Sequence, residues 1–144
     1  MSDLIVIDGD KAIFKPSFGA ATVAVRPGRI AASGSAKVSG KRVCVAGDES
    51  SVSVTGCMYV TSQYSIPGIG TLTISALAGD QQARTTAAGN KKLLLKGSSF
   101  TARFAVTAPA KQPPPGPGAP IPDATQTYSG SGNFMVADLS VKAG

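Results

Sequence analysis

The side chains that could do chemistry are sparse in this chain, and the commonest proton carrier is missing. The 144 residues contain no histidine and no tryptophan. Without histidine, a serine or cysteine nucleophile lacks its usual general base. The carboxylates number eight and are spread along the chain: Asp3, Asp8, Asp10, Asp48, Glu49, Asp80, Asp123 and Asp138. This composition predicts a protein that is not an enzyme.

The acidic and glycine-rich motifs fit turns better than ligand sites. Asp48 and Glu49 are the only adjacent acids, and they follow an expected strand, where acids commonly occupy a solvated turn. Asp8-Gly9-Asp10 lacks the further ligands and the terminal glutamate of a calcium loop. Gly68 and Gly70 precede an expected strand, whereas a dinucleotide-binding loop opens a helix. We therefore expect turns at these positions.

The two cysteines, Cys44 and Cys57, allow three interpretations. They are free buried thiols, a disulfide or close pair, or ligands of a metal ion. Zinc needs about four ligands, so two cysteines in a chain without histidine are weak metal candidates. An origin in the cytoplasm argues against a structural disulfide. We favour free thiols, and we expect no cofactor.

The charge balance is basic, with 14 lysines and arginines and a net charge of +6. The basic residues lie singly or in pairs such as Lys41-Arg42 and Lys91-Lys92, and the aromatics are three tyrosines and five phenylalanines. Nucleic-acid-binding proteins usually cluster their cations and their aromatic platforms, so we expect no nucleic-acid partner. A mildly basic surface is the simplest interpretation, and an acidic protein partner is the alternative.

Targeting signals are not evident in the sequence. No apolar run approaches the roughly 18 residues of a membrane helix. The Met1-Ser2-Asp3 start is not followed by the basic region and apolar core of a signal peptide. We therefore expect the protein to be made and first folded in a cytoplasm.

A repeated unit gives the clearest structural signal. Ser39–Gly47 and Gly89–Gly97 each combine a glycine-containing turn, two basic residues, three apolar residues, one variable residue and a closing glycine. A turn–strand–turn unit that is repeated in a small chain predicts an all-β body with internal pseudo-repeats. The residues expected in its structural turns are Gly40, Lys41, Gly47, Asp48, Gly68, Gly70 and Gly97.

Two β-hairpins are predicted in the first third of the chain. Leu4–Ile7 and Ala12–Phe14 flank Asp8-Gly9, a dipeptide that favours a tight hairpin turn. Ala36–Val38 and Arg42–Val45 flank a second turn at residues 39–41.

Alternating apolar and polar residues predict further strands around residues 52–55, 71–74 and 100–106. Ala76–Ala88 is the one stretch with helix-forming residues, and Gly79 weakens that pattern. We expect a short helix or an irregular loop there.

Composition changes sharply after residue 107. Pro109–Pro122 holds seven prolines, which exclude a helix or a central strand and favour an extended strap of polyproline II. We expect a spacer, with a ligand for a proline-recognising domain as the alternative. Beyond it, Tyr128–Val141 is predicted as a hairpin with its turn at Ser129–Asn133, pairing far along the chain at a sheet edge. The predicted divisions are a β body at 1–107, a Pro-rich strap at 108–123 and a C-terminal β-hairpin at 124–144.

The segment Ser33–Asp48 resembles the repeat of the PAAR family, with small residues, a branched strand, a Gly-Lys turn, a second strand and Gly-Asp. Pro67–Ile74 and Lys92–Gly97 are in keeping with PAAR-like proteins. The resemblance implies a small cone of short β-hairpins that caps the trimeric β-helical spike of a contractile injection system, such as type VI secretion or a phage tail-like particle. It also implies one tip per spike trimer, a possible load of cargo effectors, and contact with a target membrane on puncture.

The resemblance further implies that the protein is made in a bacterial cytoplasm and is then delivered outside the cell as part of the particle. Members of the family often hold a metal at the tip through three histidines and a cysteine. This chain lacks histidine and the Pro-Ala-Ala-Arg tetrapeptide, so the resemblance implies a metal-free tip. The alternative function is a small β-sandwich adaptor or carbohydrate-binding module, for which Tyr59, Tyr64 and Tyr128 would have to supply the aromatic platform.

Overall fold

The computed structural model describes residues 3–38, 40–88, 91–114, 116–136 and 142–143. Within these ranges the chain is nearly all β, as the sequence predicts, with two short 3₁₀ helices, η1 (Asp48–Ser51) and η2 (Gly79–Gln81). The strands are β1 (Asp3–Leu4), β2 (Lys11–Phe14), β3 (Ser17–Phe18), β4 (Ala21–Val23), β5 (Gly28–Arg29), β6 (Lys37–Val38), β7 (Lys41–Arg42), β8 (Ser53–Thr61), β9 (Gly68–Ala76), β10 (Gln82–Ala88), β11 (Lys91–Leu94), β12 (Phe100–Ala108), β13 (Lys111–Gln112), β14 (Ile121–Pro122), β15 (Thr127–Met135) and β16 (Lys142–Ala143).

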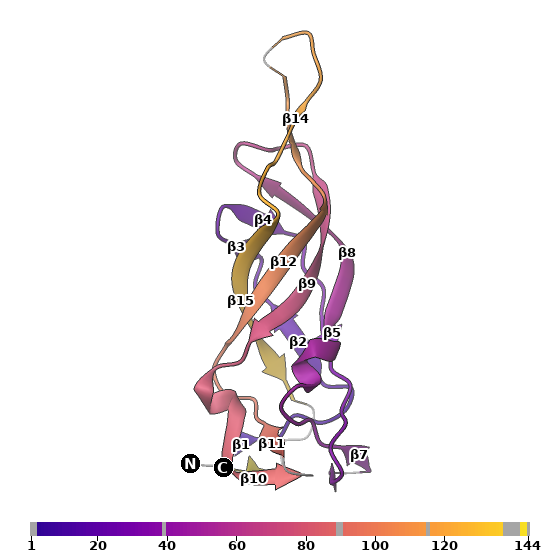
Figure 1. Ribbon diagram of the computed structural model, residues 1–144, viewed down its shortest axis with the longest axis vertical. Coiled ribbons are helices and arrows are strands. Elements are labelled where there is room, and N and C mark those ends of the chain that lie inside the picture. Colours follow the sequence, from indigo (N-terminus) through magenta and orange to yellow (C-terminus); the bar gives the residue numbers. More distant parts are fainter. Residues whose placement is uncertain (1–2, 39, 89–90, 115, 137–141, 144) are drawn as a thin grey trace.

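The body of the molecule is one eight-stranded antiparallel sheet that curls around a core. Its strand order is β3-β4-β8-β9-β12-β15-β2-β5. The curl brings each edge strand against a strand further along the sheet: β3 contacts β15, and β5 contacts β8. The result is a tall shaft, with both chain ends at one end of its long axis and the β13–β14 hairpin at the other (Figure 1).

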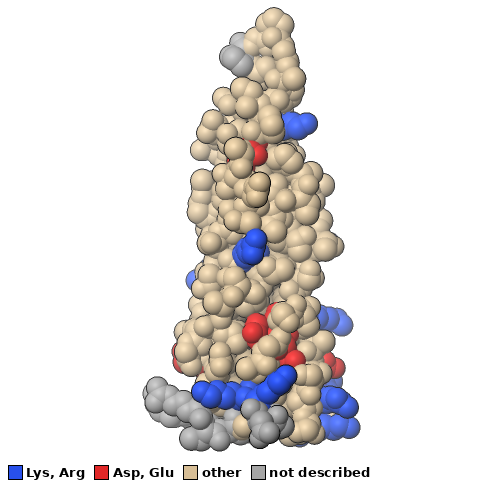
Figure 2. All heavy atoms as spheres, viewed as in Figure 1, with Lys and Arg blue, Asp and Glu red and all other residues tan. Residues whose placement is uncertain are grey.

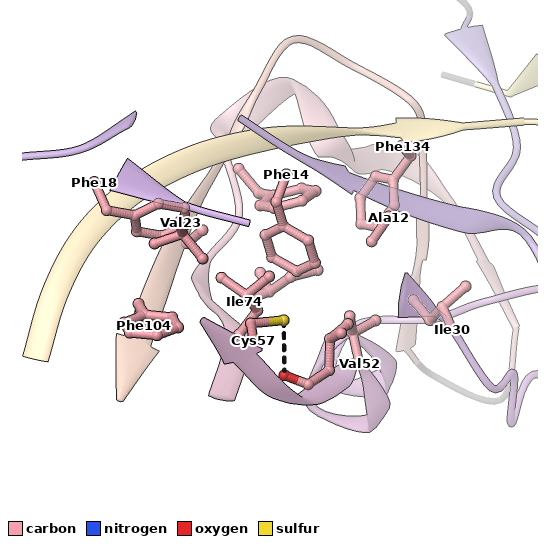
Figure 3. Packing of buried hydrophobic residues seen from close by; sticks show 14 of the residues in the cluster. Ala12, Phe14, Phe18, Val23, Ile30, Val52, Cys57, Ile74, Phe104 and Phe134 are labelled. Carbon is pink, nitrogen blue, oxygen red and sulfur yellow. Dashed lines mark hydrogen bonds between the residues drawn. The ribbon is translucent and has the colours of Figure 1, made fainter. Parts of the chain in front are cut away.

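Aromatic rings fill the shaft. Phe100, Ala102 and Phe104 of β12 are buried while the residues between them are exposed, as the alternation in the sequence predicts. Phe14 packs edge-on against Phe100 with ring centroids 5.5 Å apart, and Tyr59 packs edge-on against Phe104 at 5.2 Å. Edge-to-face pairs of this kind add to the stabilisation from burial. Figure 3 shows Phe14 and Phe104 in this interior, together with Cys57.

The predicted turn at Ser129–Asn133 is wrong, because these residues lie inside the nine-residue strand β15. β15 pairs with β12 on one side and with β2 on the other, so it lies within the sheet and not at its edge. Gly130 and Gly132, on which the turn prediction rested, are instead required by the packing of the strand. A Cβ on Gly130 would come within 2.6 Å of the Phe18 ring, and one on Gly132 within 2.7 Å of the Phe100 ring.

The predicted turn at Gly68 and Gly70 is wrong for the same reason. Both lie in β9 and not in a turn. A Cβ on Gly70 would come within 2.4 Å of the Phe104 ring, and one on Gly68 within 2.3 Å of the Ala110 backbone nitrogen. Glycine in a strand interior often marks such a close approach.

The predicted hairpin of Leu4–Ile7 with Ala12–Phe14 is also wrong in its pairing. The chain does turn at Asp8-Gly9, where Gly9 has φ of +85°. However, β2 pairs with β15 and β5, while Ile5 and Ile7 bridge to Leu95 and Val43. The segments on either side of the turn therefore enter different parts of the fold.

The second predicted hairpin is present as β6 paired with β7, with Lys37 opposite Arg42. Its turn residue Ser39 lies outside the described residues, and Lys41 belongs to β7. The expected helix or loop at Ala76–Ala88 holds only the short η2, and its second half is β10, which pairs with β11. Pairing with a neighbouring strand outweighs the weak helix preference of that segment.

The proline-rich segment doubles back on itself at the narrow end of the shaft. β13 and β14 pair antiparallel, with Lys111 opposite Pro122 and Gln112 opposite Ile121. We call residues 111–122 the apical hairpin. It continues the taper of the molecule (Figures 1 and 2). The prolines thus extend the shaft and do not run across the body as a strap.

Candidate functional site

Three chain segments that are far apart in sequence meet at the wide end of the shaft, which we call the base. Their apolar cores are Ile5-Val6-Ile7, Val43-Cys44-Val45 and Leu93-Leu94-Leu95, and we call these nine residues the base triangle. Ile7 bridges to Val43, Val45 bridges to Leu93, and Leu95 bridges to Ile5, so each arm of the triangle contacts both others.

The backbone hydrogen bonds of the triangle form a closed ring. The N–H of Val6 donates to the Leu94 carbonyl at 3.0 Å, the N–H of Leu94 donates to the Cys44 carbonyl at 2.9 Å, and the N–H of Cys44 donates to the Val6 carbonyl at 2.9 Å. A second ring of donors and acceptors surrounds the first: Asp8 N–H to the Arg42 carbonyl at 2.9 Å, Ala46 N–H to the Lys92 carbonyl at 2.8 Å and Lys96 N–H to the Leu4 carbonyl at 2.9 Å. Both rings repeat the same contact around one axis, so the base has pseudo-threefold symmetry.

The closing glycine of each arm follows the same symmetry. Gly9, Gly47 and Gly97 occupy matching positions, and their φ angles are +85°, +102° and +53°. Only glycine adopts this left-handed region without strain, so it lets each arm turn away from the triangle after its third apolar residue.

Carboxylates stabilise two of these turns by accepting backbone hydrogen bonds. Asp10 Oδ2 accepts the N–H of Ile7 at 2.8 Å, and Asp48 Oδ2 accepts the N–H of Val45 at 2.8 Å. In the third arm the N–H of Leu95 donates to the Gln81 carbonyl at 2.9 Å instead. The acids of this region therefore satisfy backbone donors, which is a structural role.

Side chains of the triangle alternate between two apolar clusters. Val6, Cys44 and Leu94 belong to the main core of the shaft. The six residues beside them belong to a separate cluster: Ile5, Ile7, Val43, Val45, Leu93 and Leu95, with Ala83. Successive strand residues point to opposite sides, so the triangle is a layer that closes the shaft.

Both cysteines are free and buried. Burial raises the pKa of the Cys44 thiol far above its ordinary value, and Asp48, Asp10 and Asp8 raise it further. Cys57 lies in the main core, with Sγ 3.8 Å from the Val54 carbonyl oxygen (Figure 3). Within the described ranges no three side chains of the metal-binding types gather.

A short two-stranded sheet lies beside each arm of the triangle. β1 pairs with β16, β7 pairs with β6, and β11 pairs with β10. β1, β7 and β11 enter the arms at matching positions, so the pseudo-threefold arrangement extends to the rim of the base. Figure 1 shows these small sheets around the base, beside both chain ends.

These features allow a comparison with known families. The model of the family described as contractile injection system spike tip protein matches residues 1–144. The chain belongs to this family. No curated protein matches the sequence. The resemblance to PAAR-like tips therefore led to the correct class. A spike tip of a contractile injection system is part of a particle that is delivered outside the cell.

The other expectations can now be placed on the spike tip. Among the predicted turn residues, Gly40, Gly47 and Gly97 have positive φ, and Asp48 begins η1. Tyr59 is buried, with its hydroxyl on Asp123, so it offers no flat platform to a sugar. No helix in the described part of the chain is long and apolar enough to cross a membrane.

Sequence reasoning found two arms of the spike tip's triangle and missed the third. Leu4-Ile5-Val6-Ile7-Asp8-Gly9 lacks the basic pair of the other two units, and its glycine was assigned to a local hairpin. The remaining signal was the spacing of three apolar residues, one variable residue and a glycine, which all three arms share.

Proposed function

We propose that this protein caps the blunt end of a trimeric β-helical spike, one copy per trimer, with the base against the spike and the apical hairpin leading. The observation that carries the proposal is the closed ring of hydrogen bonds through Val6, Leu94 and Cys44. One chain that sits on three identical subunits makes similar contacts with each only if it presents three similar surfaces. The base triangle and its three rim sheets meet that requirement.

The shape of the molecule supports this orientation. The shaft narrows from the base to the apical hairpin, as a point must (Figure 2). Residues 112–122 contain no charged side chain, and Ile121 is exposed. Charged groups are costly to move into a bilayer, so an uncharged point meets the smaller barrier on entering a target membrane.

The stoichiometry is the direct test. The purified tip is mixed with the intact spike trimer of its particle, and the complex is weighed by native mass spectrometry. We expect one tip per three spike chains and no second tip at higher concentration. Ile121→Ser at the apex is the matched control, and it should bind like the unchanged chain. A spike trimer that stays intact and binds no tip, or binds three, would overturn the proposal.

A further inference from the structure

The rim of the base carries a group of exposed cations, which we call the basic collar. Its members lie on β6, β7 and β11: Lys37, Lys41, Arg42, Lys91 and Lys92. On the face shown in Figure 2, lysine and arginine side chains gather at the base and are few along the shaft. The collar holds five of the 14 lysines and arginines of the chain.

Two acids near the base, Asp48 and Asp80, accept hydrogen bonds from residues outside the collar. Asp48 accepts hydrogen bonds from Ser33 and Val45, and Asp80 accepts them from Ser98. The base thus presents positive charge outward, while its acids hold turns together.

The collar follows the pseudo-threefold symmetry. Lys41-Arg42 precedes the arm of Cys44 at the same spacing at which Lys91-Lys92 precedes the arm of Leu94. The arm of Val6 has Asp3-Leu4 at these positions. Two of three equivalent positions are therefore cationic, and the third is anionic.

We propose that the collar binds carboxylates of aspartate or glutamate side chains at the end of the spike trimer, each subunit presenting an equivalent acidic group to one arm. The inference rests on the proposed function and adds the chemistry of the partner surface. A symmetric partner that offers one acidic group per subunit meets a lysine at two arms, and the third arm has an aspartate at the corresponding sequence position. Complementary charge of this kind sets orientation and association rate as well as affinity.

The test measures the dissociation constant of the full-length tip and the intact spike trimer. Lys41→Glu and Lys91→Glu should each weaken binding about three- to tenfold, and by similar factors, because the two positions are equivalent. Asp3→Lys should tighten binding about two- to fivefold, because it places a cation on the third arm. Lys111→Glu, which makes the same charge change at the apical hairpin, is the control and should leave binding unchanged.

Salt provides a second measurement. Raising the ionic strength from about 0.1 M to about 1 M shortens the screening length from about 10 Å to about 3 Å, so binding should weaken for the unchanged chain and less for Lys41→Glu. Melting temperatures of the variants show whether each one folds. If the dissociation constant for the spike is unchanged by salt and by both charge reversals, the collar inference is wrong, while the proposal that the tip caps the spike still stands. Collar variants that lose binding only to anionic vesicles or DNA would overturn it as well.

Discussion

At the scale of single residues, glycines opposite aromatic rings set the geometry of the shaft. Gly70 faces Phe104, Gly130 faces Phe18 and Gly132 faces Phe100, each at a distance that leaves no room for a Cβ. A narrow shaft filled with wide rings needs some strand positions without side chains. The same glycines resemble turn signals in the sequence, which is why Ser129–Asn133 was assigned to a turn.

Gly70→Ala should therefore destabilise the fold. The new Cβ would come within 2.4 Å of the Phe104 ring and 2.6 Å of the Ala105 carbonyl oxygen, and a backbone atom cannot move aside cheaply. We expect the free energy of unfolding to fall by about 3 kcal/mol, measured by denaturant titration. Gly79→Ala is the control, because no atom lies within 4 Å of its Cβ position. Equal stability of the two variants would contradict this account of the strand glycines.

A buried carboxylate below the apical hairpin predicts a pH dependence. Asp123 accepts hydrogen bonds from the hydroxyls of Tyr59 and Tyr128 and from the N–H of Thr125. Burial alone would raise the pKa of Asp123, but these hydrogen bonds outweigh burial and lower the pKa below its ordinary value of 3.8. Such a group stabilises the fold above the unfolded pKa, and the contribution is lost as pH falls through the folded pKa.

Asp123→Asn should thus cost about 2 kcal/mol near neutral pH, and its deficit should shrink as pH falls below about 4. Thermal unfolding of both chains across that range measures the effect. Burial and Asp123 together raise the pKa of Tyr128 to about 12. An absorbance titration should show that tyrosine ionising earlier in Asp123→Asn. A deficit that stays constant down to pH 2 would contradict the role given to the carboxylate.

At the scale of elements, the sequence predicts local strands well and their partners poorly. The alternation in residues 52–55 and 100–106 identifies parts of β8 and β12 because one face of each is buried. Partners depend on contacts between distant segments, such as β2 with β15, and no local pattern encodes them. The base triangle is an example. Two arms share the full repeated unit, whereas the third shares only the spacing of its apolar residues and glycine, and its place is established by the ring of hydrogen bonds.

The apical hairpin should be separable from the rest of the fold. Its strands pair with each other. It is joined to the shaft by the bridge between Lys111 and Ile66, by the Asp123 N–H to the Ala110 carbonyl at 2.8 Å and by the Ala110 N–H to the Tyr59 hydroxyl at 2.9 Å. Replacing residues 113–120 with Asn-Gly should preserve the melting temperature within a few degrees, and should preserve binding to the spike trimer. Penetration of target cells by the assembled particle should fall. If the shortened chain fails to bind the spike, the spike contact lies at the apical hairpin, and the proposed orientation with the base against the spike is wrong.

At the scale of the whole molecule, charge, symmetry and width vary together along one axis. The base is wide, pseudo-threefold and basic, whereas the apex is narrow and its residues 112–122 carry no charged side chain (Figures 1 and 2). The Tyr59–Asp123–Tyr128 cluster lies where the apical hairpin joins the shaft. Each end thus has the properties that its proposed contact requires, and the ring-filled shaft between them keeps the two ends in line.

The imperfect symmetry of the base triangle has a consequence for assembly. The three arms are alike in backbone but differ in side chains, so a single tip can seat on a symmetric trimer in three orientations of equal energy. This degeneracy favours the complex by RT ln 3, about 0.65 kcal/mol, relative to a single permitted seating. Particles in one population would therefore carry tips in three rotational settings, and averaging over the trimer axis would superimpose Val6, Cys44 and Leu94 at one position.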